Sequence, residues 1–153
     1  MPVLFTQGDL FATPDLHAYA HGCTCTGSMD AGVGLAFKKR WPQMAEQYRA
    51  LCADRRFHLG DVFVWSEGDV TVYNLAVQEN WKSRAKLAAL KHAIEHMVQL
   101  APKAGVRRIG LPRIGSGLGG LDWSRVRSVF EEVGAKTDVE LVVFDKFVRA
   151  TTP

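Results

Sequence analysis

The sequence is poor in cysteine and lacks long apolar runs, so several protein classes can be set aside. Its three cysteines, Cys23, Cys25 and Cys52, are an odd number without paired C-x-x-C spacing, which argues against a disulfide framework and against a zinc ribbon. No run of eighteen consecutive apolar residues could cross a membrane, and residues 1–5 lack the basic start of a secretion signal. We therefore expect a soluble, cytoplasmic, monomeric protein with no membrane partner.

Internal repeats, low-complexity tracts and charge blocks are also missing. Apolar residues make up 47% of the 153 residues, which is enough to build one sizeable core. The formal net charge of +3 is too small to identify a nucleic-acid-binding protein, yet it would not repel an anionic ligand. Composition therefore predicts a single domain over residues 1–153 and leaves its partner open.

Short apolar runs alternate with amphipathic stretches along the chain. Strands are predicted at residues 3–6, 19–24, 107–112 and 139–144, with a hairpin formed by 62–65 and 70–73 around Gly68. Helical periodicity predicts two short helices within 34–52 that are separated at Pro42, a third helix over 84–101, and a fourth behind Asp122 as its N-cap. The last two strands are continuous apolar runs, as central strands of a covered sheet should be. The predicted fold class is α/β, a three-layer α/β/α arrangement with a mixed central sheet.

A glycine cluster joins one predicted strand to the last helix. Gly115-Ser116-Gly117-Leu118-Gly119-Gly120 matches the pattern G-x-G-x-x-G, in which backbone N–H groups approach a phosphate and the following helix adds a partial positive charge. A glycine-rich turn without a ligand is the alternative. The cluster leaves room for one β-α-β unit, which argues against a full dinucleotide-binding domain.

A second loop has the same character. Residues 21–39 run from an apolar strand through Gly27, Gly32 and Gly34 into a helix, so two anion-binding loops could hold one diphosphate from both sides. Asp9, directly after the first strand, could accept a hydrogen bond from an exocyclic amine. Sites for a base, a diphosphate and a second sugar together suit a ligand like ADP-ribose.

These motifs resemble those of the macrodomain family, whose fold binds ADP-ribose. The resemblance is carried by GDLF (8–11), HGCTCTGSMDAGVGLAFKKRWP (21–42), PRIGSGLGGLDW (112–123) and VELVVF (139–144), which together reach over nearly the whole chain. The sequence is most similar to the branch that contains the terminal ADP-ribose protein glycohydrolase and the antitoxin macrodomain that strips ADP-ribose from DNA.

The resemblance implies a set of ligand-binding residues. Asp9 would bind the adenine amino group and the backbone of Leu10 would fix the base, while Gly32 and Val33 would face the diphosphate and the distal ribose. The phosphates would be wrapped by the glycine cluster, through Gly115, Ser116, Gly117, Leu118 and Gly119. Either Phe144 or Phe147 could stack on adenine, although packing in the core is an equal alternative for both.

The catalytic positions of that branch differ in this chain. Its active members carry a lysine where NLAVQENW (74–81) has Gln78, and some add an aspartate where Gly119 stands. A glutamine amide neither ionises near neutral pH nor forms a Schiff base, so a covalent lysine route is not expected. What is left is a water molecule oriented by Gln78 or Ser116 and assisted by the ligand's own phosphate, with loop amides stabilising the transition state.

Other polar residues near the loops are further candidates. Glu79 and Asp30 could act as bases, and Lys82 could replace the missing lysine if its loop folds back. The alternative for each of them is an ordinary polar residue of a loop. Basic residues flank both loops and could hold the phosphates of a modified DNA strand, although a solvated face is their commoner use: Lys38, Lys39, Arg40, Lys82, Arg84 and Lys86.

The resemblance therefore implies an ADP-ribosyl glycohydrolase that needs no cofactor. It would bind ADP-ribose and release it from mono-ADP-ribosylated protein carboxylates or from the bases of single-stranded DNA. A non-catalytic module that reads ADP-ribose is the alternative, and a module for another nucleotide is a third hypothesis.

One sequence pattern resembles a zinc site, but the positions of its histidines on the predicted helix argue against metal binding. His92 and His96 fit H-x-x-E-H, but they fall on the polar side of their helix, away from Leu90 and Ile94, so no metal is expected. Cys23 and Cys25 alternate about the end of a strand, and both are expected to be inert.

Overall fold

A computed structural model describes residues 3–117 and 119–148 of the chain. Six strands form one sheet in the order β1-β6-β5-β2-β4-β3. Their bounds are β1 Val3–Gly8, β2 Ala18–Thr24, β3 Val62–Glu67, β4 Val70–Gln78, β5 Arg108–Pro112 and β6 Glu140–Phe147. Strand β3 is antiparallel to β4 and all other neighbouring strands are parallel, so the mixed sheet is confirmed, with β5 and β6 inside it.

Four α-helices lie in the described part of the chain: α1 Gly32–Arg40, α2 Pro42–Ala53, α3 Leu87–Leu100 and α4 Trp123–Gly134. Pro42 opens α2, and the Asp122 carboxylate accepts a hydrogen bond from Ser124 N (3.1 Å) at the start of α4, as the sequence predicted. Two short 3₁₀ turns, Leu10–Ala12 and Ala101–Ala104, complete the elements. None of the helices within the described ranges is long and apolar enough to cross a bilayer.

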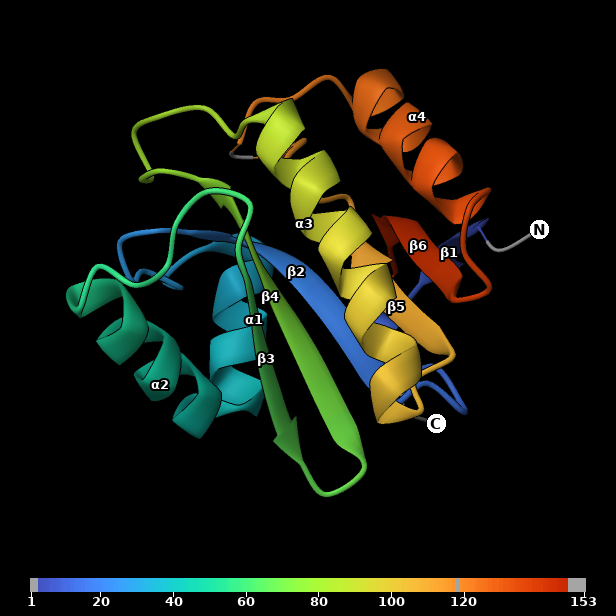
Figure 1. Cartoon of the computed structure of the whole chain (residues 1–153), viewed down its shortest axis with the longest axis horizontal. Helices are drawn as coiled ribbons and strands as arrows, with labels where there is room; N and C mark the ends of the chain where they lie inside the picture. Colours follow the sequence, from blue (N-terminus) through green and yellow to red (C-terminus); the bar gives the residue numbers. More distant parts are fainter. Residues whose placement is uncertain (1–2, 118, 149–153) are drawn as a thin grey trace.

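The helices cover both faces of the sheet, which gives the predicted three layers (Figure 1). Helices α3 and α4 bury side chains such as Leu90, Ile94 and Phe130 on one face. Helices α1 and α2 bury Phe37 and Tyr48 on the other face. The sheet is therefore enclosed by two separate apolar clusters.

The five parallel strands all end at one edge of the sheet. Because β1, β6, β5, β2 and β4 run in the same direction, the residues at their ends lie side by side from Asp9 to Gln78. In Figure 1 the loops that follow β2, β4 and β5 gather towards the upper left, whereas the β3–β4 turn lies at the bottom. In open α/β sheets, ligands bind outside the carboxyl ends of the strands, so this edge is where a site is expected.

Candidate functional site

A cavity with a volume of about 630 Å³ opens at the carboxyl edge of the sheet. Its walls are the ends of β2 and β4, the residues before and at the start of α1, and the loop after β5. We call residues 25–34 the first glycine loop and residues 113–120 the second glycine loop. Both loops contribute to the wall, through Gly32, Val33 and Gly34 on one side and Gly115, Gly117 and Gly119 on the other.

The first glycine loop presents the start of α1 to the cavity. Ala31 precedes the helix and its methyl group offers no side-chain cap to the backbone N–H groups of the first turn. Gly32 has a φ of +57°, and a Cβ built on it would meet nothing within 4 Å. An open backbone at an uncapped helix N-terminus is a ready site for an anion.

The second glycine loop is a tight turn that is held from within. Leu121 N donates to Gly115 O (2.8 Å) and Ala85 N donates to Gly119 O (2.9 Å). A Cβ on Gly119 would lie 2.7 Å from Gly115 O, whereas one on Gly117 would meet nothing within 4 Å. Gly119 is therefore required for the turn itself, and Gly117 is the position that is open beside the cavity. The predicted ligand residue Leu118 lies outside the described residues.

The helix that follows the second glycine loop already carries a negatively charged cap. The Asp122 carboxylate occupies the first turn of α4, where it accepts the hydrogen bond from Ser124 N. A second anion there would meet this negative charge. Of the helix starts that follow the two loops, that of α1 lies in the cavity wall and lacks a side-chain cap.

Gln78 lies at the cavity wall and is 9% exposed. Its Nε2 donates to Asn80 O (2.9 Å) and to Ser83 O (2.7 Å), so the amide nitrogen holds the turn that follows β4. Among the described residues no side chain or backbone N–H bonds Oε1, which leaves this oxygen as the acceptor that the side chain could offer to a water molecule. The turn's far end is fixed because Lys86 N donates to Val77 O (2.8 Å).

The other proposed polar residues are less well placed for catalysis. Ser116 Oγ donates to Arg113 O (3.1 Å), and Ser116 does not contribute to the cavity wall. Lys82 Nζ lies 5.3 Å from the centre of the Trp81 ring, and Lys82 itself does not contribute to the cavity wall. Glu79 is exposed and also lies outside the wall.

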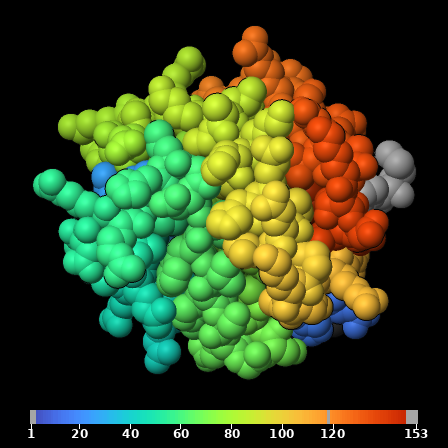
Figure 2. Space-filling model, viewed as in Figure 1, coloured from blue at the N-terminus to red at the C-terminus, as the bar shows by residue number. Residues whose placement is uncertain are grey.

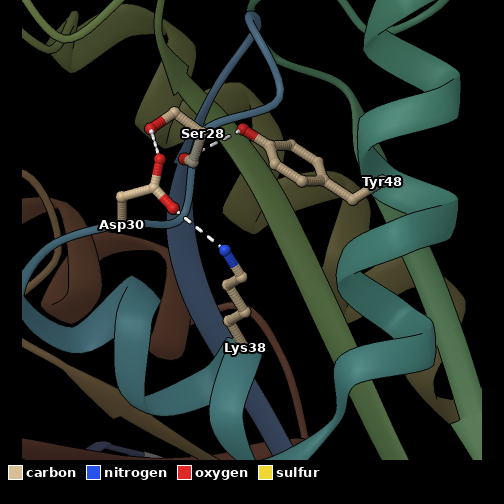
Figure 3. Close-up of polar contacts among 4 residues, drawn as sticks. All are labelled: Ser28, Asp30, Lys38 and Tyr48. Carbon is tan, nitrogen blue, oxygen red and sulfur yellow. Dashed lines mark hydrogen bonds and ion pairs between the residues drawn. The ribbon is translucent and has the colours of Figure 1, made fainter.

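Asp30 reaches the cavity wall but both of its carboxylate oxygens are occupied (Figure 3). Lys38 Nζ donates to one oxygen at 3.0 Å and Ser28 Oγ donates to the other at 3.1 Å. The hydrogen bond from Lys38 lowers the pKa of Asp30, with a smaller contribution from Ser28, so this carboxylate is a weakened base. In Figure 3 Tyr48 points at the backbone of Ser28, and its hydroxyl, which donates to Thr24 O at 2.7 Å, lies 3.5 Å from Ser28 O. Asp30 therefore shapes the first glycine loop.

A buried polar pair beneath the first glycine loop was missed by the sequence analysis. His21 Nε2 lies 2.6 Å from Asn74 Oδ1, and the imidazole stacks on Phe37 of α1 with ring centroids 3.9 Å apart. Burial lowers the pKa of His21 to about 4, against an opposing effect of the Asn74 hydrogen bond, so the ring is neutral at pH 7. The one sequence signal was a histidine within an apolar strand.

The cysteines near this pair are poor nucleophiles. Cys23 Sγ lies 3.5 Å from His21 Nε2, the nitrogen that already faces Asn74. Burial raises the pKa of Cys23 and raises the pKa of Cys25 to about 11, so both remain thiols at neutral pH. Their expected inertness agrees with these shifts.

The predicted adenine-binding residues lie farther along the same edge, at the ends of β1 and β6. Asp9 Oδ1 accepts a hydrogen bond from Phe11 N (3.0 Å), and the Leu10 side chain is buried, which suits a role for its backbone. Phe144 is 6% exposed and packs in the core, whereas Phe147 is 59% exposed. Core packing is therefore the role that the structure gives Phe144, and Phe147 stays a candidate for stacking.

The zinc-like pattern lies away from the cavity. His92 and His96 are exposed on α3, as their phase predicted. Within residues 3–117 and 119–148, no group of three or more His, Cys, Asp or Glu is arranged to hold a metal ion.

Comparisons with known proteins agree with this geometry. Residues 20–130 match the family model described as Macro domain. The chain is 27% identical over 150 residues to a protein of Mycobacterium tuberculosis named DNA ADP-ribosyl glycohydrolase, covering 93% of this chain but 42% of that protein. It is 29% identical over 142 residues to human ADP-ribose glycohydrolase OARD1, covering 93% of this chain and 90% of that protein.

Solved structures are similar over the whole fold. The macrodomain of Thermus aquaticus DarG superposes with a TM-score of 0.85 at 26% identity, covering 94% of this chain and 97% of that chain. A macrodomain protein from Streptomyces coelicolor gives a TM-score of 0.80 at 30% identity, covering 94% and 98%. The three-layer arrangement is thus shared with solved macrodomains.

Proposed function

Because the chain belongs to the Macro domain family, we propose that it binds ADP-ribose in the cavity and releases it from a mono-ADP-ribosylated protein carboxylate or DNA base. The observation that carries this proposal is the meeting of the two glycine loops across one cavity, with open backbone at Gly32 and Gly117. Relatives that are named ADP-ribosyl glycohydrolases support the hydrolytic part.

The ligand would lie along the carboxyl edge of the sheet. From Asp9 behind β1 to Gln78 at the end of β4 the edge crosses four strand intervals of about 4.8 Å, or roughly 19 Å. Adenine would lie near Asp9, Leu10 and Phe147, and the diphosphate would lie between the start of α1 and the second glycine loop. The distal ribose would then face Gln78.

Hydrolysis would use a water molecule beside Gln78. The water oxygen would form a bond to the anomeric carbon of the distal ribose as the bond to the leaving group breaks. Gln78 Oε1 would accept one hydrogen bond from this water, and a phosphate oxygen of the ligand would take its proton. A carboxylate leaves readily as an anion, whereas a DNA base needs help to leave. Ser116 would act indirectly, by shaping the second glycine loop, because its hydroxyl and its backbone N–H both donate to Arg113 O.

Binding and hydrolysis are tested separately. Calorimetry with ADP-ribose, ADP and AMP measures binding, and we expect ADP-ribose to bind tightest. Incubation with ADP-ribosylated protein and ADP-ribosylated single-stranded DNA then measures release. Binding without release from either substrate would support the reader, and tighter binding of another nucleotide would remove ADP-ribose as the ligand.

The role of Gln78 is tested by Gln78→Ala. Loss of one oriented hydrogen bond in a preorganised site should slow release on the order of 10- to 1,000-fold while ADP-ribose affinity stays within a few-fold of the parent. Ser83→Ala is the matched control, because Ser83 Oγ bonds Asn80 within the same turn and Gln78 Oε1 is retained. Equal slowing in both variants would mean that Gln78 acts by holding the turn.

A further inference from the structure

Trp81 is the most exposed large apolar side chain in the described part of the chain. Its exposed fraction is 70%, and it belongs to the wall of the cavity, so it stands at the rim. An indole that stays in water forfeits the free energy of burial, which makes an exposed tryptophan beside a binding cavity informative. The segment that carries it, between β4 and α3, projects at the upper left of the space-filling view (Figure 2).

The Trp81 backbone is held in a defined turn. Asn80 Oδ1 accepts hydrogen bonds from Lys82 N (2.9 Å) and Ser83 N (3.0 Å). Asn80 N donates to Ser83 Oγ, and Gln78 Nε2 bonds the backbone oxygens of Asn80 and Ser83. The turn therefore presents the indole from an ordered backbone, which reduces the entropy lost when a ligand stacks on it.

The rim around Trp81 is basic. Residues 79–86 carry the cations Lys82, Arg84 and Lys86 against the single carboxylate of Glu79. Arg84 lies over the second glycine loop, because a Cβ built on Gly120 would be 3.4 Å from Arg84 Nε. Arg113, which is exposed, belongs to the cavity wall itself. An anionic chain that leaves the cavity on this side would meet several cations.

We propose that Trp81 is a stacking platform for a nucleobase that flanks the modified base, so that the substrate is ADP-ribosylated single-stranded DNA. This inference rests on the proposed function. Grooves for single-stranded nucleic acid combine cations that follow the phosphates with aromatic rings on which bases stack. The Lys82 ammonium lies over the Trp81 ring at 5.3 Å, which leaves a second ring face for a base. A peptide carrying a modified carboxylate would use the cations but has no general need for an exposed indole.

The test compares three ligands of increasing length in the parent and in Trp81→Ala. They are ADP-ribose, an ADP-ribosylated nucleoside, and a single-stranded oligonucleotide that carries the same modified base in its centre. Affinity is taken as Kd, or as KM where the ligand is turned over. Since base–aromatic stacking corresponds to about 5- to 150-fold in affinity, we expect Trp81→Ala to weaken the oligonucleotide at least 5-fold more than the nucleoside or ADP-ribose. Trp81→Phe should restore most of the loss, because a smaller ring still stacks.

Two further arms separate this proposal from its alternatives. Val64→Ala removes an exposed apolar side chain from β3 and should leave all three affinities unchanged. Trp81→Ala should lower the affinity for an ADP-ribosylated peptide less than the affinity for the oligonucleotide. An equal loss for nucleoside and oligonucleotide, or a larger loss for the peptide, would overturn the stacking proposal while the proposed function stands. Failure of the parent to bind ADP-ribose would instead overturn the proposed function, and this proposal with it.

Discussion

The two glycine loops face one cavity but are built on opposite principles. The first glycine loop leaves the start of α1 uncapped, so the amides of Gly32 and Val33 are presented by a helix. In the second glycine loop the carbonyl oxygens of Gly115 and Gly119 are fixed by Leu121 N and Ala85 N, and the helix behind the loop is already capped by Asp122. Similar sequence patterns therefore give one loop that presents a helix terminus and one loop that is a fixed turn, and a glycine count alone does not separate them.

The largest effect is expected from placing a charge in the first glycine loop. Gly32→Glu would bring a carboxylate to the amides at the start of α1, where it would compete with the diphosphate. Like charges about 4 Å apart near a protein surface repel by about 4 kcal/mol, so ADP-ribose affinity should fall on the order of 100-fold or more in calorimetry.

Gly32→Gln is the matched control for that change. It has the same length and the same backbone strain at a φ of +57° but no charge, so it should lose much less affinity than Gly32→Glu. If the two variants bind ADP-ribose equally, the first glycine loop does not act through charge.

Smaller effects should distinguish two glycines of the second glycine loop, because Gly119 is needed for stability and Gly117 for binding. Gly119→Ala would force a Cβ to within 2.7 Å of Gly115 O and should lower the free energy of unfolding by about 1–3 kcal/mol, measured by urea denaturation. Gly117→Val should leave that free energy nearly unchanged and still weaken ADP-ribose, because its side chain stands beside the cavity. Retention of affinity in Gly117→Val would mean that this loop does not face the ligand.

The smallest effect is a loss of folding stability at low pH, which should affect the first glycine loop more than the second. The His21 pKa is about 4 in the folded protein and about 6.5 in an unfolded chain, so the unfolded state takes up the proton first as the pH falls. Stability from the neutral ring is complete above pH 6.5 and is lost between pH 6.5 and about 4, by about 1 kcal/mol from pH 7 to 5.5.

Urea denaturation at the two pH values measures this loss, and His21→Gln should reduce it. Exchange of the Leu35 amide, bonded to Ala31 O, should accelerate more than exchange of the Leu121 amide, bonded to Gly115 O. Equal acceleration of both amides would show that His21 does not support α1 in particular.

The elements that local patterns specify were predictable from the sequence. Pro42 at the start of α2, Asp122 before α4 and Gly68 in the hairpin each act on their own neighbours, and the structure confirms all three. The direction of Gln78 was not predictable, because its amide bonds a turn that forms after β4. Phe144 and Phe147 both belong to β6, but the buried run of this strand ends at Phe144, and a continuous apolar run gives no alternation that would distinguish a buried phenylalanine from an exposed one.

The turn around Trp81 also bears on how such a domain could change its target. The segment that carries it continues from β4 at one end and is fastened at the other end by Lys86 N on Val77 O and by Ala85 N on Gly119 O. Gln78 bonds the backbone oxygens of Asn80 and Ser83, so an exposed side chain of this stretch such as Trp81 can be exchanged without removing the bonds that hold Gln78. Variation at such exposed positions would give the same cavity different specificities for the macromolecule to which the ADP-ribose is attached.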